Sequence, residues 1–207
     1  MKTLAIVGAS GHGKVVADLA ELCGFDVVFY DDAYPQKQNI EHWQVVGQFA
    51  DLLNSKEDCK HAIVAIGNNQ IRFNLSEQLL DSGFNLPVLI HPSAVVSQYA
   101  HINEGTVVFA NAVINAFSQI SRYCIINTAT IVEHDCMLGD AVHLSPCVAL
   151  AGGTKIGKLS WLGIGAVTKQ LVEIDSNVTI GANSTVIKNI PANVVAIGSP
   201  AVIKKHQ

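Results

Sequence analysis

The sequence is poor in charge, in aromatic residues and in long apolar runs. Of its 207 residues, 14% are charged and 6% are aromatic, and the formal net charge is −4. This composition argues against a basic face for nucleic acid. No run approaches the ~20 apolar residues that span a bilayer. The run from Leu4 to Ala9 is too short for a signal peptide and enters a glycine loop. We therefore expect a cytoplasmic protein with no membrane span.

The cysteines also lack a pairing pattern. They are five in number and form no Cys-x-x-Cys pair, so a reduced compartment fits the sequence best. His134, Cys136 and His143 form the one group that resembles a set of metal ligands. Cys136, however, falls in a core position of the repeat described below, so we expect no metal.

Residues 1 to about 90 alternate strand and helix patterns. The short runs TLAIVG, DVVFYD and HAIVAIG are rich in β-branched or apolar residues, and segments of helical periodicity separate them. This alternation is typical of a small parallel α/β unit. Ninety residues make one mononucleotide-binding half, so we expect a Rossmann-like half-domain over residues 1–90.

The second half of the chain carries a repeat. An aliphatic residue recurs every six residues from Val96 to Val186, with Thr168 as the one exception among sixteen positions. The position two before each, from Ala100 to Ser184, is always small or β-branched. A fixed period indicates a repeat architecture. We interpret it as a parallel β-helix with three flat sides, in which equivalent residues of successive coils stack about 4.8 Å apart.

This repeat and the segment IGSPAVIKK after it resemble the left-handed β-helix acyltransferases of the hexapeptide-repeat superfamily. The resemblance covers roughly residues 90 to 201. It implies a homotrimer that uses an acyl-CoA. We therefore expect a left-handed parallel β-helix over residues 91–207, with a short C-terminal tail.

A glycine-rich segment, GASGHGK at residues 8–14, lies between a predicted strand and a predicted helix. Glycines let the backbone approach a phosphate, and a helix N-terminus offers unpaired N–H groups. The spacing differs from the dinucleotide fingerprint G-x-G-x-x-G. Asp31 and Asp32 end the second predicted strand, where an acid commonly meets a ribose hydroxyl. A tight turn with solvated acids is the plain alternative, but His12 is better placed as a donor to a phosphate or a sugar.

Together with AIGNNQIR, LIHPSA and NTATIVEHDC, these motifs make nearly the whole chain similar to the bacterial sugar O-acyltransferases, a group that includes the sialic acid O-acetyltransferases. The likeness narrows to the UDP-4-amino-sugar N-acetyltransferases of UDP-N,N′-diacetylbacillosamine synthesis, whose small domain binds UDP. On this resemblance we expect a nucleotide-sugar site made by Ser10, Gly11, His12, Asp31, Asp32 and Gly67, with Asn127 binding the acceptor sugar from the β-helix.

The stretch VEHD, residues 132–135, is an acid–imidazole–acid cluster among small and aliphatic residues. Acyl transfer to an amine needs a base, and histidine is the usual one. A carboxylate on its second nitrogen fixes the tautomer. In the resembling enzymes the histidine of this motif is the general base and the next acid is its partner, here His134 and Asp135. Their motif has Glu where this chain has Asp135, so Glu133 stays open as the orienting group. The plain alternative is an exposed histidine between solvated acids.

The expected acetyl-CoA site lies on later parts of the repeat. His143 is half a coil after His134, so the two can meet only if a neighbouring subunit supplies one of them. The resemblance allows this and gives His143 a contact with the acetyl group, although a plain surface position is the alternative. Gly152, one coil after His134, would leave room for the thioester. The pantetheine groove of these enzymes runs over coils that here carry Ile164, Gly165, Gly181 and Ala182.

We therefore expect an acetyl-CoA-dependent N-acetyltransferase with active sites between the subunits of a homotrimer, acting on the amino group of a UDP-linked 4-amino sugar. A sialic-acid-type O-acetyltransferase and a GDP-amino-sugar N-acetyltransferase are the alternatives within the group. The glycine loop alone suggests an NAD-dependent oxidoreductase, which the half-domain and the repeat oppose. A non-catalytic β-helix scaffold is opposed by VEHD and GASGHG. The nucleotide, the acylated sugar carbon and the acyl length stay open.

Overall fold

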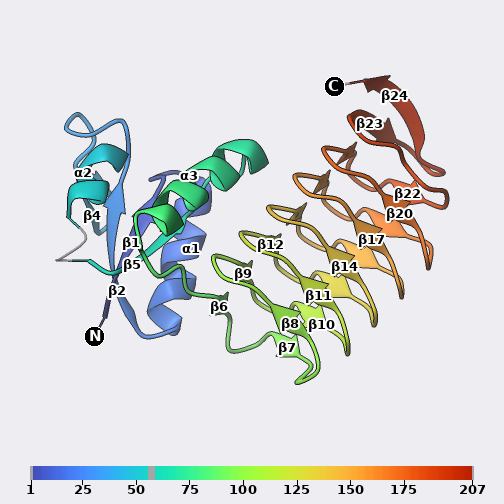
Figure 1. The fold of residues 1–207 in the computed structure, drawn as a ribbon, viewed down its shortest axis with the longest axis horizontal. Coiled ribbons are helices and arrows are strands. Elements are labelled where there is room, and N and C mark those ends of the chain that lie inside the picture. The colour runs from blue at the N-terminus through green and yellow to red at the C-terminus, as the bar shows by residue number, and fades with distance from the viewer. Residues whose placement is uncertain (1, 56–58, 207) are drawn as a thin grey trace. The chain divides into compact units, whose positions relative to one another are not determined.

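The computed structural model describes residues 2–55 and 59–206. The chain divides into two compact units, Met1–Ile90 and His91–Gln207 (Figure 1). The first unit is an α/β fold, and the second is a left-handed parallel β-helix.

One five-stranded sheet, in the order β3-β4-β2-β1-β5, forms the centre of the first unit. Strands β4, β2, β1 and β5 are parallel, whereas β3 runs antiparallel to β4. The strands are β1 (Lys2–Val7), β2 (Phe25–Tyr30), β3 (Asn39–Ile40), β4 (Trp43–Gly47) and β5 (His61–Val64), and β6 (Leu89–Ile90) ends the unit. The helices are α1 (Gly11–Leu22), α2 (Phe49–Asn54) and α3 (Asn69–Asp81). The predicted Rossmann-like half-domain is confirmed, but its sequence patterns do not predict β3, β4 or α2.

The central position of β1 explains its apolar sequence. β1 pairs with β2 and β5 along its two edges. The consecutive residues Leu4, Ala5 and Ile6 are all fully buried, so both faces of the strand are covered. The turn into α1 then packs closely on the strand end. A Cβ atom at Gly13 would collide with the carbonyl oxygen of Gly8, so the last glycine of the loop is required by packing.

The β-helix places one two-residue strand in each six-residue repeat. The strands are β7 (Val95–Val96), β8 (His101–Ile102), β9 (Val107–Val108), β10 (Val113–Ile114), β11 (Gln119–Ile120), β12 (Ile125–Ile126), β13 (Ile131–Val132), β14 (Met137–Leu138), β15 (His143–Leu144), β16 (Ala149–Leu150), β17 (Lys155–Ile156), β18 (Trp161–Leu162), β19 (Val167–Thr168), β20 (Glu173–Ile174), β21 (Thr179–Ile180) and β22 (Thr185–Val186). Two longer strands, β23 (Val194–Ile197) and β24 (Val202–His206), follow the repeats.

Every third strand pairs in parallel with its equivalent 18 residues away, which gives the prism three faces. We call them face 1 (β7, β10, β13, β16, β19 and β22), face 2 (β8, β11, β14, β17 and β20) and face 3 (β9, β12, β15, β18 and β21, continued by β23 and β24). The repeat predicted from the sequence is confirmed.

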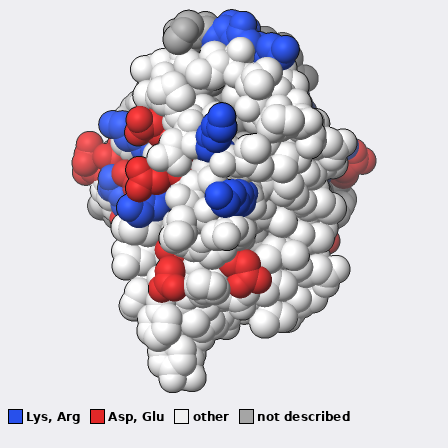
Figure 2. All heavy atoms as spheres, turned by 90° about the vertical axis from the view of Figure 1, so that its right-hand side faces the viewer, with Lys and Arg blue, Asp and Glu red and all other residues white. Residues whose placement is uncertain are grey.

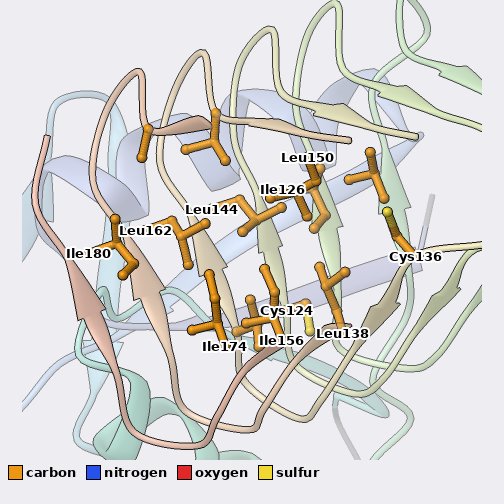
Figure 3. Packing of buried hydrophobic residues seen from close by; sticks show 14 of the residues in the cluster. Cys124, Ile126, Cys136, Leu138, Leu144, Leu150, Ile156, Leu162, Ile174 and Ile180 are labelled. Carbon is orange, nitrogen blue, oxygen red and sulfur yellow. The ribbon is translucent and has the colours of Figure 1, made fainter. Parts of the chain in front are cut away.

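The second residue of each strand fills the interior of the prism. Figure 3 shows Ile126, Leu144, Leu162 and Ile180 stacked in one column, and all four are fully buried. Thr168, the exception in the register, is also buried. Its hydroxyl lies 2.9 Å from that of Thr154 and accepts a hydrogen bond from the Ala151 N–H at 3.1 Å, which satisfies its polar group.

The small-residue register lies inside the corners. Cys124 and Cys136 are fully buried, as predicted. The hydroxyls of Ser118 and Ser160 each donate to a carbonyl oxygen fifteen residues further on, at 2.7 and 2.8 Å. The sequence did not predict the corner backbone: every sixth residue from Gly105 to Asn183 has a positive φ. The residue at that position therefore turns the chain at the corner.

Charged side chains are sparse on the surface. Among the described residues on the face drawn in Figure 2, acidic and basic side chains stand in small groups separated by uncharged ones. Within residues 2–55 and 59–206, no helix is long and apolar enough to cross a membrane.

Candidate active site

A pocket of about 290 Å³ opens at the corner between β13 and β14. We call it the corner pocket. It is lined by His134, Asp135, Gly152, Gly153, Gln170 and Leu171. These residues come from the equivalent corners of three successive coils, so coil stacking assembles the pocket from distant parts of the sequence.

His134 and Asp135 form the polar centre of the corner pocket. The Nδ1 atom of His134 lies 2.7 Å from Oδ2 of Asp135, and both side chains are largely exposed. Asp135 has a φ of 60°, the left-handed conformation of a corner. This backbone turn lets the short carboxylate reach the ring of the preceding residue. A carboxylate at Nδ1 accepts the N–H there and leaves Nε2 with its lone pair exposed to the pocket.

Glu133, the other candidate partner, lies just before the corner. Its N–H donates to the Leu150 carbonyl and its own carbonyl accepts from Ser118, so its backbone is held in the coil. The carboxylate that contacts His134 is that of Asp135, although the aspartate is one methylene shorter than the residue of the family motif.

Gly152 lies one coil after His134, as predicted from the repeat, and lines the corner pocket. A Cβ atom there would lie 2.6 Å from Cε1 and Nε2 of His134. The missing side chain at Gly152 therefore leaves space for the imidazole ring. Gly153 closes the same corner, with its N–H donating to the His134 carbonyl at 2.9 Å.

Cys136, next to the pair, is inert. Burial raises the pKa of its thiol to about 11, and metal binding and nucleophilic attack both need a thiolate. Among the described residues, 2–55 and 59–206, no three His, Cys, Asp or Glu side chains are grouped so as to hold a metal ion.

An apolar groove of about 400 Å³ runs along another corner, between face 3 and face 1. Three of the predicted cofactor residues line it: Ile164, Gly181 and Ala182. A fourth, Gly165, follows Ile164 at the corner and has a φ of 68°. The other lining residues are Ser145, Pro146, Trp161, Gly163, Thr179 and Ile180. The groove thus gathers residues of three coils, and sequence reasoning missed Ser145, Pro146 and Trp161. A tryptophan at an outward position of the repeat was the available signal.

His143 lies next to the groove residue Trp161, on the neighbouring strand β15. It occupies the outward position of β15 and is 9% exposed, so the plain surface position considered above is wrong. Its ring stacks on that of Trp161, with centroids 5.7 Å apart and planes 14° apart. The indole N–H of Trp161 in turn donates to the Ser145 hydroxyl at 2.8 Å. This stack fixes one side of the groove.

Within one chain, the structure brings the predicted base together with Gly152 but not with the other predicted cofactor residues. His134 lies at the corner between face 1 and face 2, whereas His143 lies on face 3. Asn127 belongs to the corner of the apolar groove, one coil before Ser145, and its side chain accepts from the Thr128 N–H at 2.9 Å. The expected contact of Asn127 with the acceptor beside His134 is therefore not made within one chain.

A third pocket, about 230 Å³ in volume, lies at the carboxyl ends of β1 and β2 in the first unit. We call it the strand-end pocket. It is lined by Val7, Gly8, Tyr30, Asp31, Asp32, Phe49, Ile66 and Leu75. Ligands of parallel α/β sheets bind outside the carboxyl ends of the strands. Asp31 and Asp32 line the pocket as expected, and Gly67 follows the lining residue Ile66.

The two aspartates of this pocket have different surroundings. Asp31 accepts the N–H of Ala9 at 2.7 Å and that of Ala33 at 3.0 Å. Its carboxylate therefore ties the glycine loop to the end of β2. Asp32 is exposed, so its carboxylate is the one available to a ligand.

Ser10, Gly11 and His12 begin helix α1 beside the strand-end pocket. Ser10 is the N-cap residue, and its side chain makes no capping hydrogen bond. Burial, and secondarily the charge of Arg72, lowers the pKa of His12 to about 4. His12 is therefore neutral near pH 7 and can offer a phosphate or a sugar a neutral N–H donor.

Comparison with known proteins agrees with this geometry. Residues 3–79 match the family described as the PglD N-terminal domain. The chain is 30% identical over 214 residues to the GDP-perosamine N-acetyltransferase of Escherichia coli, covering 97% of this chain and 96% of that protein. It is 38% identical over 114 residues to the UDP-N-acetylbacillosamine N-acetyltransferase of Bacillus subtilis, covering 53% and 52%. It is also similar to the crystal structure of PerB from Caulobacter crescentus in complex with CoA and GDP-perosamine, with a TM-score of 0.94, 40% identity and coverage of 99% and 98%.

The buried, neutral state of His12 predicts an acid-sensitive first unit. The unfolded chain takes up a proton on this histidine below about pH 6.5, whereas the folded protein does so near pH 4. Its contribution to stability is complete above pH 6.5 and is lost as the pH falls toward 4, by about 2 kcal/mol at pH 5. Urea unfolding of the wild type and of His12→Gln at pH 7 and pH 5 should show the smaller loss in the variant. The exposed histidine His42 supplies the matched control, His42→Gln. Equal losses in the wild type and His12→Gln would contradict the assignment.

Proposed function

Since the chain belongs to the hexapeptide-repeat sugar acetyltransferase family, we propose that it transfers the acetyl group of acetyl-CoA to the amine of a nucleotide-linked amino sugar. The observation that carries the proposal is the His134–Asp135 pair, in which a carboxylate holds Nδ1 at 2.7 Å and directs Nε2 into the corner pocket. A base of this kind suits attack by an amine on a thioester.

In the proposed reaction the sugar amine attacks the carbonyl carbon of the thioester. His134 Nε2 takes the proton that the amine loses as the new C–N bond forms. The C–S bond then breaks, and the proton returns from His134 to the leaving sulfur to give CoA. Asp135 does not itself change protonation; it keeps the imidazole in the tautomer that can accept and stabilises the imidazolium.

We assign the acetyl-CoA arm to the apolar groove. A pantetheine chain is long and narrow, with apolar segments between its amides, and the groove offers small residues, Gly163, Gly181 and Ala182, along an apolar wall. Trp161, held by His143 and Ser145, closes one side. Burial of apolar surface is the main source of affinity in such sites.

The positions of the base and the groove support a homotrimer with active sites between subunits. Both corners border face 1, one on each side. The outward residues of face 1 are small or aliphatic: Val95, Val113, Ile131, Ala149, Val167 and Thr185. Face 2 instead carries polar residues, including the Lys155–Glu173 ion pair at 2.8 Å. If three copies pack with face 1 inward, the groove corner of one chain meets the His134 corner of the next.

We place the nucleotide of the acceptor in the strand-end pocket, with Asp32 and neutral His12 as polar contacts and Ser10, Gly11 and Gly67 beside them. A GDP-linked sugar is the better-supported acceptor. The relative that matches 97% of the chain acts on GDP-perosamine by its name, whereas the UDP-N-acetylbacillosamine enzyme matches 53% of it. The UDP-linked substrate expected from the sequence motifs is therefore the second choice.

A panel assay tests the proposed reaction. Release of free thiol from acetyl-CoA should occur with GDP-linked 4-amino sugars, more slowly with UDP-linked ones, and not with the same sugars lacking the amine. Acetyl transfer to a sugar hydroxyl in place of the amine would point to the O-acetyltransferase alternative. Lack of thiol release with every nucleotide amino sugar would contradict the proposal.

Removal of the proposed base should affect the chemical step alone. His134→Ala should lower kcat by about 10²- to 10⁴-fold, the usual contribution of a positioned general base. It should leave the KM for acetyl-CoA nearly unchanged, because His134 does not line the apolar groove assigned to the acetyl-CoA arm. Asp135→Asn should lower kcat by less, and the matched control Glu133→Gln should stay within about twofold of the wild type. A near-normal kcat in His134→Ala would disprove the assignment of the base.

Complementation tests the interfacial site. Neither His134→Ala, which lacks the base, nor Ala182→Trp, which fills the groove, should be active alone. In mixed trimers, some sites combine an intact base with an intact groove of the neighbour, so equal mixing during co-expression should restore about one quarter of wild-type activity. Sedimentation should show a trimer. An active monomer, or mixtures without regained activity, would argue that each chain holds a complete site.

A further inference from the structure

Arg72 is a charged residue in the interior of the first unit. It lies on α3 and is 1% exposed. By volume it heads the fully buried side chains of the described residues. A buried guanidinium is costly unless hydrogen bonds and nearby charges compensate it. Its position therefore indicates a specific task within this unit.

The guanidinium of Arg72 holds the loop between β5 and α3. Its Nη1 donates to the carbonyl oxygens of Ile66 at 2.9 Å and Gly67 at 3.2 Å, and its Nη2 donates to Oδ1 of Asn69 at 2.9 Å. The planar fork of an arginine can serve these acceptors together, which a lysine cannot do. One side chain thus holds three residues in and next to this loop by hydrogen bonds.

That loop forms one wall of the strand-end pocket. Ile66 lines the pocket, and the loop lies close against Gly8, where a Cβ atom would be 2.9 Å from Cγ1 of Ile66 and 3.1 Å from the Ala65 carbonyl. A small shift of the loop would therefore change the width of the pocket. The charge of Arg72 also acts on His12 in the first turn of α1, where it is one cause of the lowered pKa.

We propose that Arg72 is the positioning residue of the nucleotide-sugar pocket, which holds the Ile66–Gly67 wall at the separation from Gly8 and His12 that the nucleotide requires. Arg72 itself acts through the loop and does not touch the substrate. The inference rests on the proposed function, because it assigns the acceptor nucleotide to the strand-end pocket.

Steady-state kinetics of three variants test this role. Arg72→Met should raise the KM for the nucleotide amino sugar by about 10- to 100-fold, the usual effect of losing hydrogen bonds to a charged group. The kcat at saturating sugar and the KM for acetyl-CoA should stay within about twofold, since both depend on the β-helix. Arg72→Lys, which keeps the charge but not the fork, should give an intermediate KM. Gln70→Ala is the matched control, because Gln70 lies on α3 but contacts Asn74 and not the loop.

A change in kcat or in the KM for acetyl-CoA equal to the change in sugar KM would indicate general damage and overturn the proposal. So would an unchanged sugar KM in Arg72→Met. If Arg72→Met does not fold, Arg72→Lys and Asn69→Ala decide by the same readout, with a raised sugar KM expected in both. A wild-type protein inactive with every nucleotide amino sugar contradicts the proposed function itself. An active wild type whose Arg72 variants keep their sugar KM contradicts the role of Arg72 alone.

Discussion

Stacking of aliphatic side chains at intervals of 18 residues is the interaction on which the second unit depends. Each strand has two residues, so a single coil has few hydrogen bonds and no interior of its own. Leu144 becomes fully buried because Ile126 and Leu162 cover it from the neighbouring coils (Figure 3). Repeat proteins gain stability from such nearest-neighbour contacts. The same requirement fixes the positions of the corners, where the chain must turn in a left-handed conformation.

The corners are where this scaffold leaves side chains available for chemistry. The inward position of each strand, except at Thr168, carries an aliphatic residue. The position two before it carries a small or β-branched residue. His134 and Asp135 occupy the turn between them, so they can vary without loss of the core. Their arrangement still depends on the stacking, because Gly152, one coil later, leaves the space that the imidazole ring fills. The stacked coils therefore hold the exposed His134–Asp135 pair in place.

In the first unit, two polar side chains hold the backbone around the strand-end pocket. Asp31 uses its carboxylate on the backbone of the glycine loop, and Arg72 uses its guanidinium on the β5–α3 loop. Asp31 accepts from main-chain N–H groups, and Arg72 donates to two main-chain carbonyl oxygens and to the Asn69 side chain, so both hold the backbone beside the pocket. Asp32 and His12 are left as candidate contacts for a ligand. The low pKa of His12 follows from this dense packing, since burial is its largest cause.

The sequence by itself determined the two-part architecture and the position of His134 between two candidate carboxylates. A period of six in two registers can be recognised from the sequence alone, because it does not depend on contacts between distant residues. Residues adjacent in sequence, such as those of VEHD, are also adjacent in space. The tertiary structure decided what depends on side-chain direction and on residues far apart. It decided that Asp135, at a left-handed corner, and not Glu133 contacts His134, and that Gly152 accommodates a ring. It also decided that His143 is buried against Trp161 and that Asn127 lies at a different corner from His134. The tertiary structure also decided that Arg72 is buried against the Ile66–Gly67 loop. A charged residue in a helix pattern reads as solvent-exposed, and only the packed unit supplies the carbonyl oxygens that hold it inside.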